Sequence, residues 1–242
     1  MTFYLFTIVL LLILSIMFGK IIFFISKRSF FPIIVRKVMN YSKLSKTELE
    51  NTMLGILYYA FPILSITILC ITYRYPVYRL FKIASVDIKY IPIAIIAYIS
   101  LLSGISGIAG IFFPNTDWVN VISNVSWIES VNARNNKMKF LALILGAFVE
   151  EFFFRGICFA MLINKFPQYS VWIALIISSV LFGIEQILFI KDKKTMFIFM
   201  ISGISVGLLG GVLILYTNSI LPSLVAHEFF VFFYFSKFNF KH

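Results

Sequence analysis

The chain has 242 residues, of which 61% are hydrophobic and only 13% are charged, and its mean hydropathy is +0.98. Soluble globular domains are nearer half apolar and a quarter charged, so this composition excludes a soluble domain and favours a polytopic helical membrane protein. The formal net charge of +11 would suit nucleic-acid binding in a soluble protein. Here the positive residues cluster between apolar runs, which is typical of membrane topology, so we expect no nucleic-acid partner.

Seven apolar runs approach the roughly 20 residues that a helix needs to cross a bilayer. In chain order they are Phe3–Ser26, Met53–Tyr73, Ile91–Phe113, Phe140–Asn164, Val171–Ile190, Thr195–Tyr216 and Ser219–Phe235. We therefore predict an all-α, polytopic membrane bundle of about seven transmembrane helices, with Phe30–Val35 as the place for an eighth or re-entrant span. The first run has no basic leader and no small-residue cleavage signature, so we expect a retained span rather than a signal peptide.

The segments between these runs predict the orientation of the bundle. With the N-terminus outside, 14 Lys and Arg residues fall on the inner side and 5 on the outer side, so the positive-inside rule favours N-out and C-in. We interpret Arg36–Asn51 as a cytoplasmic loop with a short amphipathic helix, and Pro114–Lys139, which holds two tryptophans, as an interfacial segment. We divide the chain into N-terminal helices with their loop (residues 1–139), a membrane core (140–235) and a tail (236–242).

Glycines recur at helical spacing in two of the runs. One set occupies every fourth position of the sixth run and the other lines the third run: Gly203, Gly207 and Gly211, and Gly104, Gly107 and Gly110. Small residues at such spacing let helices approach closely in lipid, so we expect packing faces at both sets.

Three ionisable residues lie inside the fourth run: Glu150, Glu151 and Arg155. Charged side chains in a membrane helix cost about 2.5–3.5 kcal/mol each on insertion scales and usually face a protein-lined, wet cavity, so they mark a functional site. At about 100° per residue, Arg155 lies about 40° from Glu151 but about 140° from Glu150. Because residues four apart can pair, we expect Arg155 to neutralise Glu151, which leaves Glu150 available as a general base.

Two later runs carry further polar groups. The fifth run has Phe182, Glu185 and Gln186, and the first and last of these share a helix face. The seventh run has Ser223 and His227 one turn apart, and His227 is the only histidine inside an apolar run. We predict a polar cavity enclosed by the fourth, fifth and seventh helices.

Metal and nucleophile chemistry fit this sequence poorly. A zincin motif has the form His-Glu-x-x-His, and the stretch that begins at His227-Glu228 has Val231 in place of the second histidine. Catalytic zinc generally takes three protein ligands, so one ligand pair is already incomplete. Cys70 and Cys158 each lie alone in an apolar run, and no serine or cysteine has a histidine and an acid in suitable context. We therefore expect no metal and no cofactor, and a water activated by a carboxylate. Intramembrane carboxylates by themselves also fit a small transporter or proton relay.

The motif Glu150-Glu151-Phe152-Phe153-Phe154-Arg155 resembles the Glu-Glu-x-x-x-Arg signature of the CPBP family. These proteins are the intramembrane CAAX proteases and bacteriocin-processing enzymes, also called Abi proteins. The family carries Phe-x-x-x-His and His-x-x-x-Asn motifs on later helices, and Phe182–Gln186 and His227–Val231 lie in those places. The resemblance covers roughly Phe140 to Phe235.

The resemblance implies an integral-membrane protease that hydrolyses a peptide bond of a membrane-associated peptide or protein without zinc. Glu150 would activate the attacking water, Glu151 and Arg155 would support it structurally, and His227 would stabilise the oxyanion. Family precedents are prenylated CAAX-type tails in eukaryotes and peptide pheromone, bacteriocin or immunity roles in bacteria. The Ile-, Phe- and Lys-rich composition is compatible with an AT-rich bacterial genome and so with a bacterial cell membrane.

Two positions depart from the family pattern. Gln186 stands where the second motif, which begins at Phe182, has a water-holding histidine, and Val231 stands where the last motif has asparagine. Glutamine cannot exchange a proton near neutral pH, and valine has no polar side-chain atom. Losing one oxyanion donor costs about 10²–10³ in rate, and losing acid–base help costs about 10²–10⁴. The alternative is therefore a non-catalytic relative that acts in bacteriocin immunity or regulation by binding a membrane peptide or partner. The oligomeric state is left open by the sequence.

Overall fold

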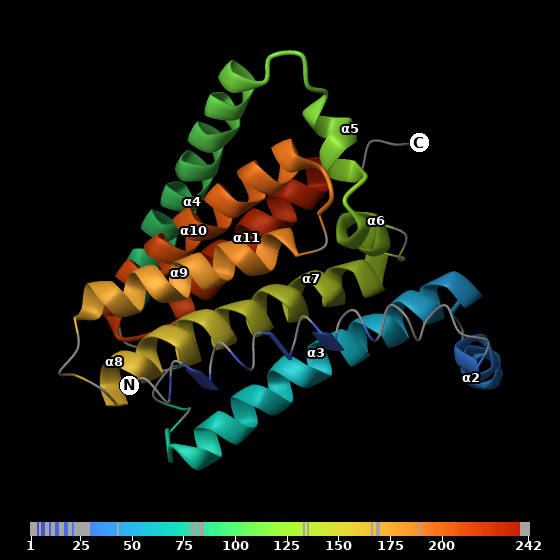
Figure 1. Ribbon diagram of the computed structural model, residues 1–242, viewed down its shortest axis with the longest axis horizontal. Coiled ribbons are helices and arrows are strands. Elements are labelled where there is room, and N and C mark those ends of the chain that lie inside the picture. The colour runs from blue at the N-terminus through green and yellow to red at the C-terminus, as the bar shows by residue number, and fades with distance from the viewer. Residues whose placement is uncertain are drawn as a thin grey trace.

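In the computed structural model of the chain, the described residues form helices and the turns that connect them (Figure 1). The described residues are 30–42, 44–76, 78, 81, 85–132, 134, 136–165, 167, 170–188 and 190–237, with isolated positions between 4 and 21. Most of the predicted first span, Phe3–Ser26, lies outside the described residues. Within the described ranges there is no strand, so the predicted all-α class is confirmed.

The helices follow the predicted apolar runs closely. In chain order they are α2 (Phe30–Met39), α3 (Lys46–Thr72), α4 (Ser85–Phe112), α5 (Trp118–Ser123), α6 (Ser126–Asn132), α7 (Asn136–Glu150), the π-helix η2 (Glu151–Met161), α8 (Leu162–Lys165), α9 (Val171–Ile187), α10 (Lys193–Thr217) and α11 (Leu221–Lys237). Helices α3, α10 and most of α4 are long and apolar enough to cross a membrane, and α9 and α11 are shorter apolar helices. Elements α7, η2 and α8 follow one another without a break, so they form one continuous helix over the predicted fourth run. The protein is an integral-membrane helical bundle.

Helix α3 begins at Lys46, well before the predicted start at Met53. Its first turn is fixed by a capping box, in which the backbone N–H of Glu48 donates to the Ser45 hydroxyl at 3.3 Å and the Ser45 N–H donates to the Glu48 carboxylate at 2.9 Å. A serine followed three residues later by glutamate satisfies two of the free N–H groups at a helix start, which lets the helix extend into polar sequence. The prediction of a loop over Arg36–Asn51 is therefore wrong, because helices occupy most of that segment.

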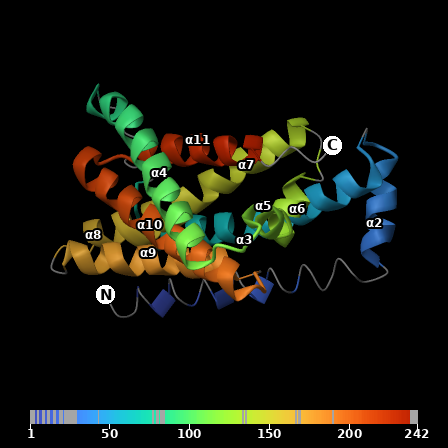
Figure 2. The same ribbon diagram turned by 90° about the horizontal axis from the view of Figure 1, so that it is seen from above.

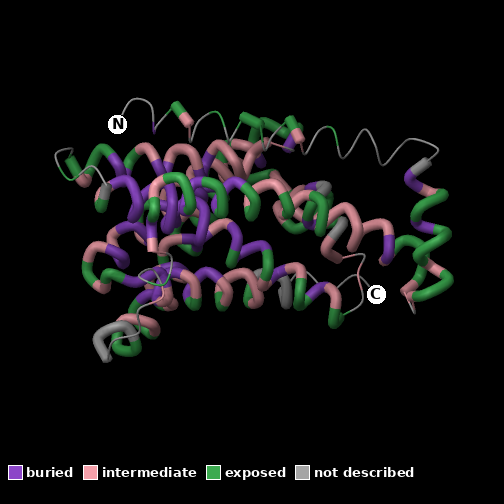
Figure 3. Tube along the Cα trace, turned by 90° about the horizontal axis from the view of Figure 1, so that it is seen from below, coloured by how far each residue is buried: buried purple, intermediate pink, exposed green. Residues whose placement is uncertain are grey.

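Helix α2 lies crosswise to α3, at the N-terminal end of α3 (Figures 1 and 2). It has ten residues, about 15 Å at 1.5 Å per residue, which is about half of the hydrocarbon thickness of a bilayer. The described part of α2 is therefore too short to cross a bilayer, and an eighth span at Phe30–Val35 stays a prediction. Phe31 and Val35 are buried against Leu49 of α3, whereas most other residues of α2 are exposed (Figure 3).

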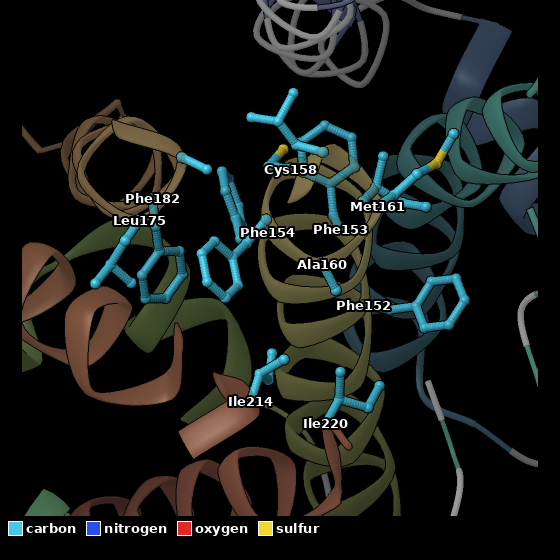
Figure 4. Close-up of a cluster of buried hydrophobic side chains, with 14 of the residues drawn as sticks. Phe152, Phe153, Phe154, Cys158, Ala160, Met161, Leu175, Phe182, Ile214 and Ile220 are labelled. Carbon is cyan, nitrogen blue, oxygen red and sulfur yellow. The ribbon is translucent and has the colours of Figure 1, made fainter. Parts of the chain in front are cut away.

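The π-helix η2 is buried along its whole length, from Glu151 to Met161. Its backbone amides bond to the fifth preceding carbonyl instead of the fourth, a geometry that is rare and often found at functional sites. Figure 4 shows Phe154 of η2 beside Phe182 of α9, with Phe152 on another side of the helix. The ring centroids of Phe154 and Phe182 are 5.0 Å apart. Every side chain of η2 therefore faces protein rather than lipid.

The glycine face of α10 packs against α9, as the sequence predicts. A Cβ atom on Gly203 would lie 2.8 Å from the Cα of Gly183, and one on Gly207 would lie 2.7 Å from the Cα of Ser179. Only glycine leaves room for the two backbones at this separation. The set on α4 differs, because a Cβ atom on any of its three glycines meets nothing within 4 Å. Among the described residues, the predicted packing face on α4 has no partner.

The helices run between two ends of the bundle (Figure 1). The first turns of α3, α7 and α10 lie at the same end as the last turns of α9 and α11. At the other end, the ring of Tyr4 lies 4.9 Å from that of Tyr73, and the Tyr4 hydroxyl donates to the Ile157 carbonyl at 2.9 Å. The segments that carry the positive charges predicted for the inner side therefore adjoin one end of the bundle.

Candidate active site

The two adjacent glutamates lie at the junction of α7 and η2 and differ in exposure. The Glu151 side chain is fully buried, whereas that of Glu150 is 25% exposed. The neighbouring positions thus place one carboxylate inside the packed bundle and leave the other partly exposed.

Glu151 is held by side chains from η2 and α11. Arg155 Nη2 lies 3.4 Å from Oε1, and the Ser223 hydroxyl donates to Oε2 at 2.7 Å. The Nδ1 atom of His227 lies 2.8 Å from Oε1. Arg155 therefore pairs with Glu151 and not with Glu150, as the four-residue spacing predicts. Both oxygens of Glu151 are engaged, so this carboxylate anchors η2 to α11.

The charge of Arg155 is buried against an aromatic ring. Its Cζ atom lies 4.0 Å from the ring centroid of Phe182, which is a cation–π geometry. The Tyr98 hydroxyl of α4 also interacts with the guanidinium group. The Glu151 carboxylate and the Phe182 ring stabilise this buried cation as well, which gives the phenylalanine of the second motif a physical task.

Tyr98 of α4 extends the network. Its hydroxyl lies 2.8 Å from Ser223 Oγ, and because Ser223 donates its hydrogen to Glu151, Tyr98 is the donor to Ser223. Gly210 of α10 packs against this network. A Cβ atom on Gly210 would lie 2.6 Å from Ser223 Oγ and 3.0 Å from Arg155 Nε. Helices α4, η2, α10 and α11 thus meet around the Glu151 carboxylate.

Glu150 faces His227 and Gln186. Its Oε2 atom lies 3.9 Å from His227 Nε2, and it accepts a long hydrogen bond of 3.5 Å from Gln186 Nε2. A separation of 3.9 Å is too long for a direct hydrogen bond and is of the kind that a water molecule bridges. The carboxylate of Glu150 and the imidazole of His227 are therefore directed at the same space without a hydrogen bond between them.

Glu151 sets the orientation of the His227 ring. An ionised carboxylate only accepts hydrogen bonds, so the hydrogen between the two groups is carried by Nδ1 of the imidazole. The Nε2 atom is then the one directed at Glu150. A buried carboxylate that orients a histidine in this way is a recurring arrangement in hydrolytic sites.

The position of the missing asparagine is apolar in the structure. Val231 lies one turn after His227 on α11 and packs against a buried cluster formed by Val125, Ile128, Leu143 and Ile190. The family places two hydrogen-bond donors on this helix, a histidine imidazole and an asparagine amide. In this chain only the imidazole, that of His227, is present.

The residues predicted for the site come together in one cluster. They are Glu150 and His227 with Glu151, Arg155, Phe182 and Gln186. Two contributors were not predicted: Tyr98, described above, and Tyr58 of α3, whose hydroxyl donates to Glu185 at 3.1 Å. Both tyrosines lie inside apolar runs rather than at the interface, where tyrosine concentrates, and that placement is the signal by which they can be found.

Within the described ranges, no group of three or more His, Cys, Asp or Glu side chains is arranged to hold a metal ion. That the site works without metal or cofactor stays a prediction.

A bundle of apolar helices that encloses an acid–imidazole–amide cluster defines a membrane protein with an intramembrane polar site. Residues 136–233 match the family model described as type II CAAX prenyl endopeptidase Rce1-like. The matched segment runs from the start of α7 into α11, and it confirms the resemblance of this segment to the CPBP family of membrane proteases. No curated protein and no solved structure gives a significant match to the chain.

Proposed function

We propose that the protein is a membrane protease that hydrolyses a peptide bond of a membrane-associated peptide or protein with a water activated by Glu150. The observation that carries this proposal is the 3.9 Å between Glu150 Oε2 and His227 Nε2, with Glu150 partly exposed and Glu151 fully engaged elsewhere. The match to a family of membrane endopeptidases supports the same reaction class.

In the proposed reaction, Glu150 takes a proton from a water molecule, and the water oxygen attacks the carbonyl carbon of the scissile peptide bond. The developing oxyanion accepts a hydrogen bond from Nε2 of His227. This donor role requires a hydrogen on Nε2 as well as on Nδ1, and the Glu151 carboxylate lies 2.8 Å from Nδ1. The tetrahedral intermediate then collapses, the C–N bond breaks, and the leaving amine takes up the proton that Glu150 acquired.

The proposed substrate is held by the lipid bilayer in which the bundle lies. Prenylated CAAX-type tails and bacterial peptide pheromones or bacteriocins are the substrate classes that the family suggests. We further propose a bacterial cell membrane with the N-terminus outside and the C-terminus inside. The positive-inside balance supports this orientation. The first turns of α3, α7 and α10, which follow the inner positive segments, lie at one end of the bundle (Figure 1).

One observation favours a second function, that of a non-catalytic relative that binds a membrane peptide or partner in bacteriocin immunity or regulation. Val231 is part of an apolar cluster where the family places a polar oxyanion donor, and Gln186 replaces the histidine of the second motif. A protein that has lost both groups can keep the fold and a binding surface while it loses the reaction.

The test compares wild type with Glu150→Gln for cleavage of membrane-anchored peptides by the purified full chain. The matched control is Glu228→Gln, which removes the neighbouring acid of α11, whose Oε2 has no hydrogen-bond partner among the described residues. The proposal expects cleavage by wild type and by the control, and none by Glu150→Gln. Equal cleavage by Glu150→Gln would refute it. Peptide binding without cleavage by wild type would support the second function.

A further inference from the structure

A chain of hydrogen bonds approaches Glu150 from α3 and α9. The Tyr58 hydroxyl donates to Oε1 of Glu185 at 3.1 Å, and Nε2 of Gln186 donates to Oε2 of Glu185 at 2.9 Å. The same nitrogen donates to Oε2 of Glu150 at 3.5 Å. Tyr58 and Glu185 occupy none of the motif positions, and the proposed reaction gives them no part. We call Tyr58, Glu185 and Gln186 the hydrogen-bond chain.

The two bonds from one nitrogen fix how the Gln186 amide is turned. A primary amide carries two N–H donors on one side and an acceptor oxygen on the other. Oε2 of Glu185 accepts from the amide nitrogen of Gln186, which turns the amide oxygen away from this carboxylate. Tyr58 occupies the other oxygen of Glu185, which stops this carboxylate from rotating away. The second N–H of the amide is thereby directed at Glu150.

The charged surroundings make these neutral donors important. Glu185 is near Tyr59 as well as Tyr58 on α3, Glu150 on α7 and Arg155 on η2. Arg155 is already paired with the second glutamate of the motif. Two carboxylates therefore share one amide, and the orientation of that amide decides where the Glu150 carboxylate is held.

We infer that Tyr58 and Glu185 are positioning residues that fix the Gln186 amide against Glu150, and that this hydrogen-bond chain stands in for the histidine of the second motif. The inference rests on the proposed function, because it concerns the base of that reaction. An amide donates a hydrogen bond but exchanges no proton near neutral pH. The chain therefore orients Glu150 and carries no proton to or from it.

The first test removes the two positioning groups one at a time. Tyr58→Phe and Glu185→Gln are expected to lower kcat for peptide cleavage about 10- to 100-fold, the usual loss when a partner behind a site group is removed. KM is expected to stay unchanged, since neither residue touches the substrate. The matched control is Tyr216→Phe, which deletes the hydroxyl of an exposed tyrosine on α10 and is expected to retain the wild-type kcat. Elution volume and Tm of each purified variant show whether it is folded, and Tyr58→Phe serves if Glu185→Gln aggregates.

The second test asks whether Glu185 acts through Gln186. Effects of residues that work as a unit do not add, whereas effects of independent residues do. The double variant Glu185→Gln/Gln186→Ala is therefore expected to have a kcat no lower than that of Gln186→Ala alone. If the two losses multiply, the residues act separately and the inference is overturned.

The outcomes separate this inference from the proposed function. Loss of cleavage in Glu150→Gln together with a wild-type kcat in Glu185→Gln would overturn the positioning role and leave the proposed function standing. Absence of any Glu150-dependent cleavage by the wild-type chain would overturn both. Lowered kcat at unchanged KM in Tyr58→Phe, with a wild-type kcat in Tyr216→Phe, would support both.

Discussion

The Nδ1 atom of His227 lies 2.8 Å from Oε1 of Glu151, although the two residues are 76 positions apart in the chain. This contact joins α11 to η2 at the most buried point of the site. It gives the two glutamates of the motif separate tasks, since the first stays partly exposed and the second holds the bundle together.

Glu151→Gln is expected to cost stability, whereas Glu150→Gln is expected to cost activity alone. Removing the Glu151 charge leaves Arg155 buried without its anion, and breaking a buried ion pair in this way typically costs about 3–5 kcal/mol. Thermal unfolding of the purified protein in detergent measures the difference. A Glu151→Gln variant as stable as wild type would contradict the anchoring role.

Gly207→Ala is expected to destabilise the protein, and Gly107→Ala is its matched control. The added methyl group of the first variant meets the Cα of Ser179 at 2.7 Å, while that of the second meets nothing within 4 Å. Overpacking of this kind costs about 1–3 kcal/mol. An alanine on an open helix face is more favourable than glycine by about 1 kcal/mol. The two Tm values should therefore move in opposite directions, and parallel shifts would argue against the close packing of α9 and α10.

Gln186→His is expected to raise the rate of peptide cleavage about 10²-fold, because it supplies an imidazole beside Glu150. Val231→Asn should help less, since an asparagine there must enter an apolar cluster at a cost of about 1–3 kcal/mol for an unpaired polar group. Cleavage rates and Tm values of the two single variants and the double variant decide the matter. If the double variant is folded but cleaves no peptide, the result would favour a binding role over a weakened enzyme.

Asp192 is expected to make stability depend on pH through the cap of α10. The side chain and backbone N–H of Thr195 donate to its Oδ2 at 2.7 Å and 2.8 Å, and these bonds hold the pKa of Asp192 below its ordinary value. The stabilisation is therefore complete above the unfolded pKa of about 3.9 and is lost as the pH falls through the lower folded value. Asp192→Ala should cost about 1 kcal/mol at neutral pH.

The control for this prediction is Asp192→Asn, which keeps a capping oxygen but has no carboxyl group to titrate. Its unfolding temperature should fall less than that of wild type when the pH is lowered from 7 to 3. An equal fall in both proteins would show that other groups dominate the acid response.

Local sequence patterns predicted the parts of this structure that depend on neighbours along one helix. The pairing of Arg155 with Glu151 follows from their four-residue spacing, and the helices follow from apolar runs of membrane length. The partners of His227 could be predicted only as far as its helix, because the distance between α11 and η2 depends on how the whole bundle packs.

Three features were beyond such reasoning, each for a physical reason. The long π-helix η2 depends on packing from every side. Because its apolar sequence is buried on all faces, the sequence shows no periodic pattern that separates a buried face from an exposed one. The early start of α3 was present in the sequence as Ser45 and Glu48, but the polar segment around them obscured it. Tyr58 and Tyr98 reach the site through tertiary contacts with α9 and α11, which spacing along their own helices cannot show.

The π geometry of η2 also limits which insertions and deletions the chain can accept. The rotation of the residues after Met161 about the helix axis depends on the π-helix before them. In a π-helix each backbone amide bonds to the fifth preceding carbonyl, whereas in an α-helix it bonds to the fourth. Deleting one apolar residue between Glu151 and Met161 would change the rotation of α8 relative to the glutamates. Such a deletion removes no charged group, yet it would misalign α9 and its amide with the acid that they face. The length of this one helical segment is therefore as strictly constrained as the identity of its charged residues.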